Sequence, residues 1–410
     1  MGASGDDYDM AFDGSWLAYS QMVTKGAYMD ITDLLPEYAP DLYEVYQGLG
    51  VLEAASVDGR VVALPWTMSM NQRPYFTYNK QLAEEAGITV EDGAIETFED
   101  LDGVLGQFHA AFPDIEAIGE FKAEAIYAKY ELAPLGFHNL VYSLNDEHPQ
   151  IMAFEDTEAY AERAMWAKKW NDAGYIGKNA VNEEVDSNVL LGEDLKFSHF
   201  TWHEWSKKLG KKSGDDIAVT SEMYPDMKYP NRSPLANVMA INANAANPER
   251  TLMFLNLMET DKELYDLVHY GILGETYKVN GEMAEYAVEG MTGANSNYME
   301  WGGQWALWKP QFMRPNATYP EGFWAKEAEL AAQDKNVNSV LFGFFPDSSA
   351  IENELAARDQ IWELDKIIRY GAVKSADDSV AEMRSKQTAA GSAEIIAEVQ
   401  RQVDEFLSGK

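Results

Sequence analysis

Cysteine is absent from the 410-residue chain, which excludes disulfides, thiolate metal sites and a cysteine nucleophile. Basic charge is scarce: 32 lysines and arginines stand against 68 aspartates and glutamates, a formal net charge of −36. Such a chain repels phosphate backbones and anionic lipids, so we expect no nucleic-acid or electrostatic membrane binding. No apolar run reaches the roughly 18 residues that span a bilayer. The start, MGASGDDYDMAF, has no basic or apolar export-signal region.

Familiar catalytic signatures are also missing. No G-x-S-x-G, H-E-x-x-H, Walker A or G-x-G-x-x-G motif occurs. The nearest metal-like pattern is His199, His203 and Glu204, but residues four apart in a strand lie about 13 Å apart, too far to share one ion. We therefore expect no metal and no other cofactor. A pair of carboxylates set for glycoside hydrolysis stays open, because the fold and not the spacing would bring the two together.

The length and the order of patterns predict several α/β domains. A chain of 410 residues is too long for one core, and 46% hydrophobic residues can fill more than one. A short strand ends at Asp13 and a helix follows that stops at Gly26. Helices are expected to begin at the N-caps Thr97 and Thr157. The run PLANVMAI predicts a strand, and one long amphipathic helix is expected after the turn at 247–248.

The tryptophans predict the chemistry of the site. Trp166 and Trp170 lie one turn apart on an expected helix, which is typical of core packing. Other tryptophans gather beside turn residues and polar side chains. A sugar ring has an apolar face and a rim of hydroxyls, so it favours flat aromatic platforms with planar hydrogen-bonding groups nearby. The candidate ligand-binding residues are Asp13, Trp16, Trp66, Asn71, Arg73, Trp202, His203, Glu204, Trp301, Gln304 and Trp305.

The order of these segments resembles one family. The run from DMAFDGSWLAYSQMVTKG through GRVVALPW to YFTYNKQLAEEAGI resembles the extracellular solute-binding proteins (family 1) of bacterial ABC sugar importers, in their Gram-positive lipoprotein branch. GEDLKFSHFTWHEW is similar to a family segment whose Trp lies in the cleft, although Leu195 and Lys196 replace its small residue and Met. WGGQW is similar to a G-N-Q segment with Gly303 in place of Asn, and the last 70 or so residues resemble the branch's C-terminal domain.

The resemblance implies a two-lobed α/β fold of the type II periplasmic-binding-protein kind, with an interlobe cleft and a hinge. Lobe 1 would comprise 1–80 and 236–310, and lobe 2 would comprise 81–235 and 311–410 with the C-terminal helices. Family members normally begin with a signal peptide, a lipidated cysteine and a strand–helix–strand–helix unit. This sequence starts after those parts, so we expect the N-terminal strands and helices of lobe 1 to be missing.

The function that the resemblance implies is that of the substrate-binding component of an ABC importer. It would close on a carbohydrate, which we expect to be an oligosaccharide, and deliver it to the permease without catalysis. Trp66, Trp202 and Trp301 would stack on sugar faces, while Asp13 either reads hydroxyls or caps the helix after it. A monomer is expected, as is an extracellular location with a lipid anchor that this chain lacks. A binder of peptides or cationic solutes, and a glycoside hydrolase, are the alternatives.

Overall fold

A computed structural model describes most of the chain. It covers residues 8–408 apart from 16, 53–54, 58, 67–73, 90–92, 115, 119–123, 178–179, 183–190, 195–217, 232–233, 292–297, 299–306, 308, 310, 315–324, 326–328, 330–331 and 333–335.

The chain folds into two compact units, and neither is a continuous stretch of sequence. Unit 1 comprises residues 1–70, 232–317 and 342–344, and unit 2 comprises 71–231, 318–341 and 345–410. The expected lobes change at residues 80, 235 and 310, so the units run close to those boundaries without coinciding with them. The short return at 342–344 has no counterpart in the sequence-based division.

Unit 1 combines short strands with helices. Its elements are β1 (Met10–Asp13), α1 (Tyr19–Thr24), α2 (Leu34–Tyr38), α3 (Pro40–Leu49), β2 (Ser56–Val57), β3 (Arg60–Val61), β4 (Leu64–Pro65), the 3-10 turn η3 (Pro234–Ala236), β12 (Val238–Ile241), α9 (Pro248–Thr260), α10 (Lys262–Tyr270), β13 (Tyr277–Asn280) and β14 (Met283–Tyr286).

The centre of unit 1 is a three-stranded sheet in the order β1-β12-β4, here called sheet A. Both outer strands run antiparallel to β12, so they run parallel to each other. Every residue of β12 is buried, as expected for an apolar strand covered on both faces. Met239 and Ile241 join a core formed with α2, α3, α9 and α10, in which Leu35, Leu252 and Tyr265 are almost fully buried.

Unit 2 is larger and richer in helices. Its elements are β5 (Tyr75–Asn79), α4 (Lys80–Ala86), α5 (Phe98–Ala111), α6 (Glu124–Lys129), β6 (Leu132–Pro134), β7 (Leu140–Ser143), β8 (Met152–Ala153), the 3-10 turn η1 (Phe154–Asp156), α7 (Glu158–Asp172), β9 (Leu191–Asp194), β10 (Ala218–Glu222), β11 (Tyr229–Pro230), β15 (Asn336–Val337), α13 (Glu352–Trp362), α14 (Asp365–Arg369), α15 (Ala376–Ala389) and α16 (Ser392–Ser408).

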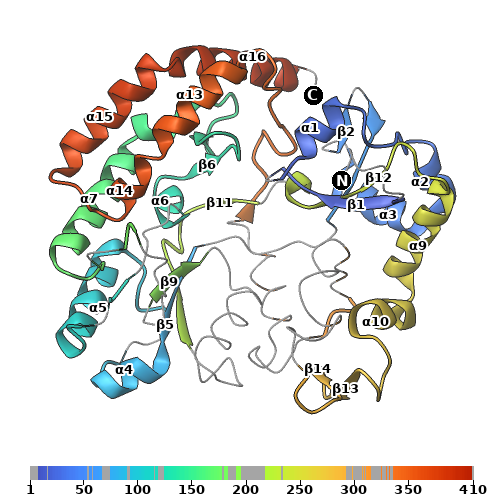
Figure 1. Ribbon diagram of the computed structural model, residues 1–410, viewed down its shortest axis with the longest axis horizontal. Helices are drawn as coiled ribbons and strands as arrows, with labels where there is room; N and C mark the ends of the chain where they lie inside the picture. The colour runs from blue at the N-terminus through green and yellow to red at the C-terminus, as the bar shows by residue number, and fades with distance from the viewer. Residues whose placement is uncertain are drawn as a thin grey trace. The chain divides into compact units, whose positions relative to one another are not determined.

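Two antiparallel sheets, β10-β5-β9 and β6-β7-β8, lie in unit 2. Helix α7 packs against α14 and α15, and α15 in turn packs against α13 and α16, as Figure 1 shows in green and red. Trp166 and Trp170 of α7 lie in this core with their ring centroids 5.6 Å apart. The prediction that these two tryptophans serve packing is confirmed.

Most predicted helix starts are confirmed by their hydrogen bonds. The Thr97 side chain accepts from the Asp100 N–H and forms a capping box, and Thr157 accepts from the Tyr160 N–H. The single long helix expected after residue 248 is wrong: α9 ends at Thr260 and α10 begins at Lys262. Asp261 divides them, because its carboxylate accepts from the N–H groups of residues 263 and 264 and so caps a new helix.

The expected α/β class is confirmed, since strands and helices alternate in both units. Among the described residues, no helix combines the length and the apolar character needed to cross a bilayer.

Candidate functional site

Sheet A brings two predicted site residues to one edge of unit 1. Asp13 is the last residue of β1 and Pro65 is the last residue of β4, and both pair with Val238 from opposite sides. Neighbouring strands lie about 4.8 Å apart, so the two chain ends leave the sheet about 10 Å from each other. Trp66 follows Pro65 directly, and its N–H donates to the Asn237 carbonyl at 3.2 Å. Asp13 and Trp66 are far apart in sequence, but they therefore lie at the same end of sheet A.

Asp13 is tied into this edge by three hydrogen bonds. Its Oδ1 accepts from the Gly14 N–H at 2.8 Å and from the Ala18 N–H at 3.1 Å, and its Oδ2 accepts from the Tyr28 hydroxyl. The side chain is 4% exposed. Ala18 is the N-cap residue of α1, which has no side-chain cap, so Asp13 fixes the turn that leads into the helix rather than occupying the N-cap position itself. A direct contact between Asp13 and a ligand stays a prediction.

Two tyrosines surround the Asp13 carboxylate. The rings of Tyr19 and Tyr28 stack with centroids 6.2 Å apart. Burial, followed by the hydrogen bond to Asp13, raises the pKa of Tyr28 far above its usual value. Burial and then the charge of Asp13 raise the pKa of Tyr19 as well. Both phenols therefore stay neutral at physiological pH, and the Tyr19 hydroxyl is buried without a hydrogen-bond partner in the described part of the chain.

Trp66 is half-buried and borders a small pocket of unit 1. The pocket wall also includes Tyr46, Leu255, Leu307 and Lys309. Its volume of ≈ 20 Å³ leaves room for about one water molecule, so it is not itself a sugar site. Trp66 therefore borders a small gap in the packing of unit 1.

The remaining predicted site residues lie outside the described residues. They are Trp16, Asn71, Arg73, Trp202, His203, Glu204, Trp301, Gln304 and Trp305.

The residues on either side of the tryptophan-rich segment 299–306 do lie in the described structure. Before it, the Tyr298 carbonyl accepts from the Tyr286 hydroxyl of β14 at 3.2 Å. After it, Leu307 and Lys309 line the pocket that Trp66 borders. Both flanks of the segment are therefore fixed on unit 1.

Sequence reasoning missed Asn237, Glu259 and Lys309. Asn237 is fully buried at the start of β12 and holds the backbone of Trp66. Glu259 and Lys309 are buried and their charged atoms lie 2.5 Å apart. Asn237 could have been found from the sequence, because it is a polar residue directly before an apolar strand. The pairing of Glu259 with Lys309 could not, because no sequence pattern near either residue indicates the other.

Metal binding finds no support in the described part of the chain. It contains no group of three or more histidine and acidic side chains arranged to hold an ion.

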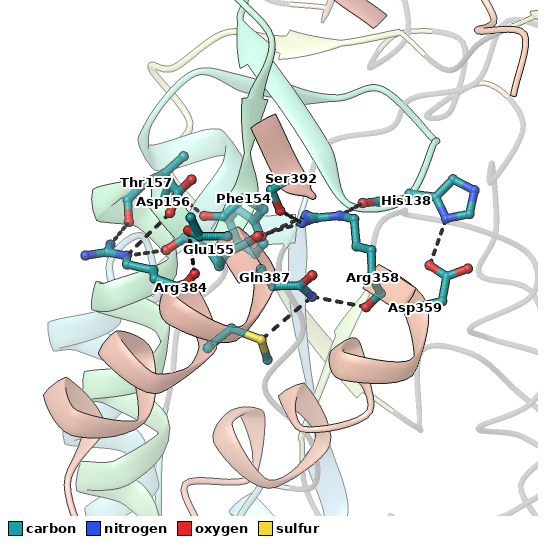
Figure 2. A network of polar contacts seen from close by, with 12 residues as sticks. His138, Phe154, Glu155, Asp156, Thr157, Arg358, Asp359, Arg384, Gln387 and Ser392 are labelled. Carbon is teal, nitrogen blue, oxygen red and sulfur yellow. Dashed lines mark hydrogen bonds and ion pairs between the residues drawn. The ribbon is translucent and has the colours of Figure 1, made fainter. Parts of the chain in front are cut away.

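A second polar cluster, in unit 2, fastens the C-terminal helices (Figure 2). Arg358 of α13 donates to both carboxylate oxygens of Glu155 at 2.7 and 2.8 Å, and both side chains are 1% exposed. The same guanidinium donates to the His138 carbonyl at 2.9 Å and to Ser392 Oγ at 3.0 Å. From α15, Arg384 donates to the Glu155 carbonyl at 2.6 Å. These bonds position the last helices and offer no open site.

Comparisons with known proteins agree with this architecture. Residues 340–408, which include the fastened helices, match a family model described as a domain of unknown function, DUF3502. The chain is 25% identical over 427 aligned residues to a carbohydrate ABC transporter substrate-binding protein of Streptococcus pneumoniae serotype 4, and the match covers 100% of this chain and 81% of that protein.

Among solved structures, the N-glycan transport solute binding protein NgtS from Streptococcus pneumoniae superposes with a TM-score of 0.77 at 22% identity, over 99% of this chain and 88% of that one. This chain has the solute-binding-protein fold. The structure of NgtS in complex with Man5GlcNAc superposes with a TM-score of 0.68 at 21% identity, over 100% and 88% of the two chains. The predicted resemblance to solute-binding proteins is confirmed.

Within the solute-binding-protein fold, the described residues present one candidate ligand-facing region, the end of sheet A with Asp13, Asn237 and Trp66. It combines an aromatic ring, a buried carboxylate held by neutral donors, and backbone fixed by the sheet. Such an arrangement suits binding of a neutral polar ligand more than bond making or breaking.

Proposed function

We propose that this chain is the substrate-binding component of an ABC importer that binds a carbohydrate and delivers it to the permease. The observation that carries the proposal is the edge of sheet A, where Trp66 and Asp13 meet in a chain with the solute-binding-protein fold. The relative described as a carbohydrate ABC transporter substrate-binding protein and the NgtS complex with Man5GlcNAc support it. They also favour an oligosaccharide as the ligand.

In this proposal Trp66 offers one face of its indole to the apolar face of a sugar ring. The Trp66 backbone is held by Asn237, so the ring projects from a fixed point of the sheet. The other proposed platforms are Trp16, Trp202, Trp301 and Trp305, and the proposed hydroxyl-binding residues are Asn71, Arg73, His203, Glu204 and Gln304.

Asp13 contributes mainly by ordering its surroundings. Its oxygens already accept from Gly14, Ala18 and Tyr28, so the carboxylate fixes the turn into α1 and the Tyr28 ring. A fixed turn lowers the conformational entropy that ligand binding would otherwise cost. A further hydrogen bond from a sugar hydroxyl to Asp13 remains part of the proposal.

No bond of the sugar is made or broken in this proposal, so the protein is not an enzyme. We place it outside the cell, attached to the surface by a lipid, as a monomer with the permease subunits as partners. The resemblance of the sequence to the Gram-positive lipoprotein branch supports this location.

The test is a panel of mono- and oligosaccharides, including oligomannose glycans, screened by thermal shift and intrinsic tryptophan fluorescence. Sugars should raise the melting temperature and be recovered unchanged, as checked by mass spectrometry. Trp66→Ala should weaken binding about tenfold, a loss of about 1.4 kcal/mol, while Trp66→Phe keeps a flat ring and should lose less. If only cationic peptides stabilise the protein, or if the sugars are cleaved, the proposal is wrong.

A further inference from the structure

The chain that follows the tryptophan-rich segment is fastened to one short stretch of unit 1. Lys309 Nζ lies 2.5 Å from Glu259 Oε2, at the C-terminal end of α9. Gln311 Nε2 donates to the other carboxylate oxygen of Glu259 at 2.7 Å and to its carbonyl at 3.2 Å. One acidic side chain therefore holds two residues of the returning chain.

Helix α10 adds further attachments to the same stretch. The Lys309 N–H donates to the Tyr265 hydroxyl at 3.4 Å, and the Arg314 N–H donates to the Tyr270 hydroxyl at 2.8 Å. The Arg314 guanidinium donates to Asp266 at 3.2 Å. Lys309, Gln311 and Arg314 are thus bound to the two helices, and the attachment that lies nearest to the tryptophan-rich segment is the one at Lys309.

The buried pair formed by Lys309 and Glu259 also reaches the strand that carries Trp66. Lys309 and Trp66 line one pocket together with Tyr46. The Tyr46 hydroxyl donates to the Pro65 carbonyl at 2.8 Å, directly before Trp66. Burial raises the pKa of Tyr46, and the charge of Glu259 adds to that rise. Through Lys309, the pair therefore borders the pocket that the end of β4 and Leu307 also line.

Stability alone gives no reason for a charged pair in this place. The side chains of Lys309 and Glu259 are each 8% exposed, and burial lowers the pKa of Lys309. Removing two charges from water costs about as much as their attraction returns, so apolar side chains of similar size would stabilise unit 1 as well or better. The ion pair and the hydrogen bonds from Gln311 do, however, tie the returning chain to one acidic side chain beside the pocket.

We propose that Glu259 and Lys309 are positioning residues for carbohydrate binding, which set the orientation of the Trp66 indole by fixing Leu307 and Lys309 in the wall of the pocket that Trp66 also lines. This inference rests on the proposed function, because the orientation of Trp66 matters only if its ring contacts the ligand. Neither residue needs to contact the sugar.

The test compares Lys309→Met and Glu259→Gln with Lys309→Arg, which keeps the charge. A matched control is Arg358→Met, which breaks a buried acid–base pair inside unit 2, whereas Trp66 belongs to unit 1. Two quantities are measured for each folded variant: the sugar Kd by calorimetry well below the melting temperature, and the indole N–H signal of Trp66 in protein labelled with ¹⁵N-tryptophan, assigned with Trp66→Phe.

We expect the Kd to rise about tenfold in Lys309→Met and Glu259→Gln, with partial recovery in Lys309→Arg. The Trp66 signal should shift or broaden in the first two variants and stay in place in Arg358→Met, whose melting temperature falls while its Kd is unchanged. If Lys309→Met does not fold, Gln311→Leu, which removes only hydrogen bonds to Glu259, is measured in its place with the same expectation.

A lower melting temperature with an unchanged Kd and an unchanged Trp66 signal would overturn the inference, because it would show a purely structural pair. The Trp66 signal is recorded without sugar. An unmoved signal therefore refutes positioning even if the protein binds carbohydrate, and a wild-type protein that binds no carbohydrate refutes the proposed function separately.

Discussion

Replacing Arg358 by Met should strongly destabilise unit 2. The substitution removes both bonds to the Glu155 carboxylate and those to His138 and Ser392, and it leaves the Glu155 charge buried at 1% exposure. Breaking one partner of a buried ion pair costs about 3–5 kcal/mol. The C-terminal helices α13, α15 and α16 meet at this point, so the loss should appear there first.

Hydrogen exchange read by mass spectrometry separates this effect from the behaviour of unit 1. Amides of α13 and α15 should exchange faster by two to three orders of magnitude, which corresponds to about 3–4 kcal/mol, while β12 keeps its protection. The double variant Arg358→Met with Glu155→Leu removes both charges and should regain much of the loss. A single variant that loses less than about 1 kcal/mol would refute the argument from burial.

Three further changes test separate features. Burial lowers the pKa of His269 from 6.5 to about 4. The neutral imidazole therefore stabilises the folded state fully above the unfolded pKa, and this stabilisation is lost as the pH falls towards the folded pKa. Unfolding free energy should therefore drop by about 2 kcal/mol between pH 7.5 and 5, and His269→Gln should lessen this drop. Asp261→Ala removes the cap of α10 and should cost about 1 kcal/mol in urea unfolding, whereas Asp261→Ser should cost less. Gly371→Ala places a Cβ 2.0 Å from the Ala167 carbonyl oxygen, at a residue whose φ is +64°. We therefore expect the free energy of unfolding to fall by about 3 kcal/mol or more. A melting temperature equal to that of the wild type would contradict the close approach of the two segments.

Local features of the fold could be predicted from the sequence. The strand that ends at Asp13 and the caps at Thr97 and Thr157 depend on neighbouring residues, and all three are found. The division of the helix at Asp261 was missed, because an acidic residue inside a polar run is compatible with both a helix interior and a cap.

The non-local part of the site lay beyond sequence reasoning. Val238 pairs with Asp13 and Pro65 at once, and that register depends on a strand far along the chain. The pairing of Lys309 with Glu259 likewise depends on how α9 meets a returning segment. The aromatic pattern is the basis of the carbohydrate hypothesis, whereas the tertiary packing decides which polar groups support Trp66.

The position of β12 has a consequence for how the polypeptide reaches its native state. Within sheet A both β1 and β4 pair with β12, and β12 enters the chain about 170 residues after β4. Until ribosomal synthesis has passed Ile241, the first two strands have no partner in this sheet, and their backbone groups are open to mispairing. Nascent chains of this protein should therefore depend on a holding chaperone until β12 has been synthesised.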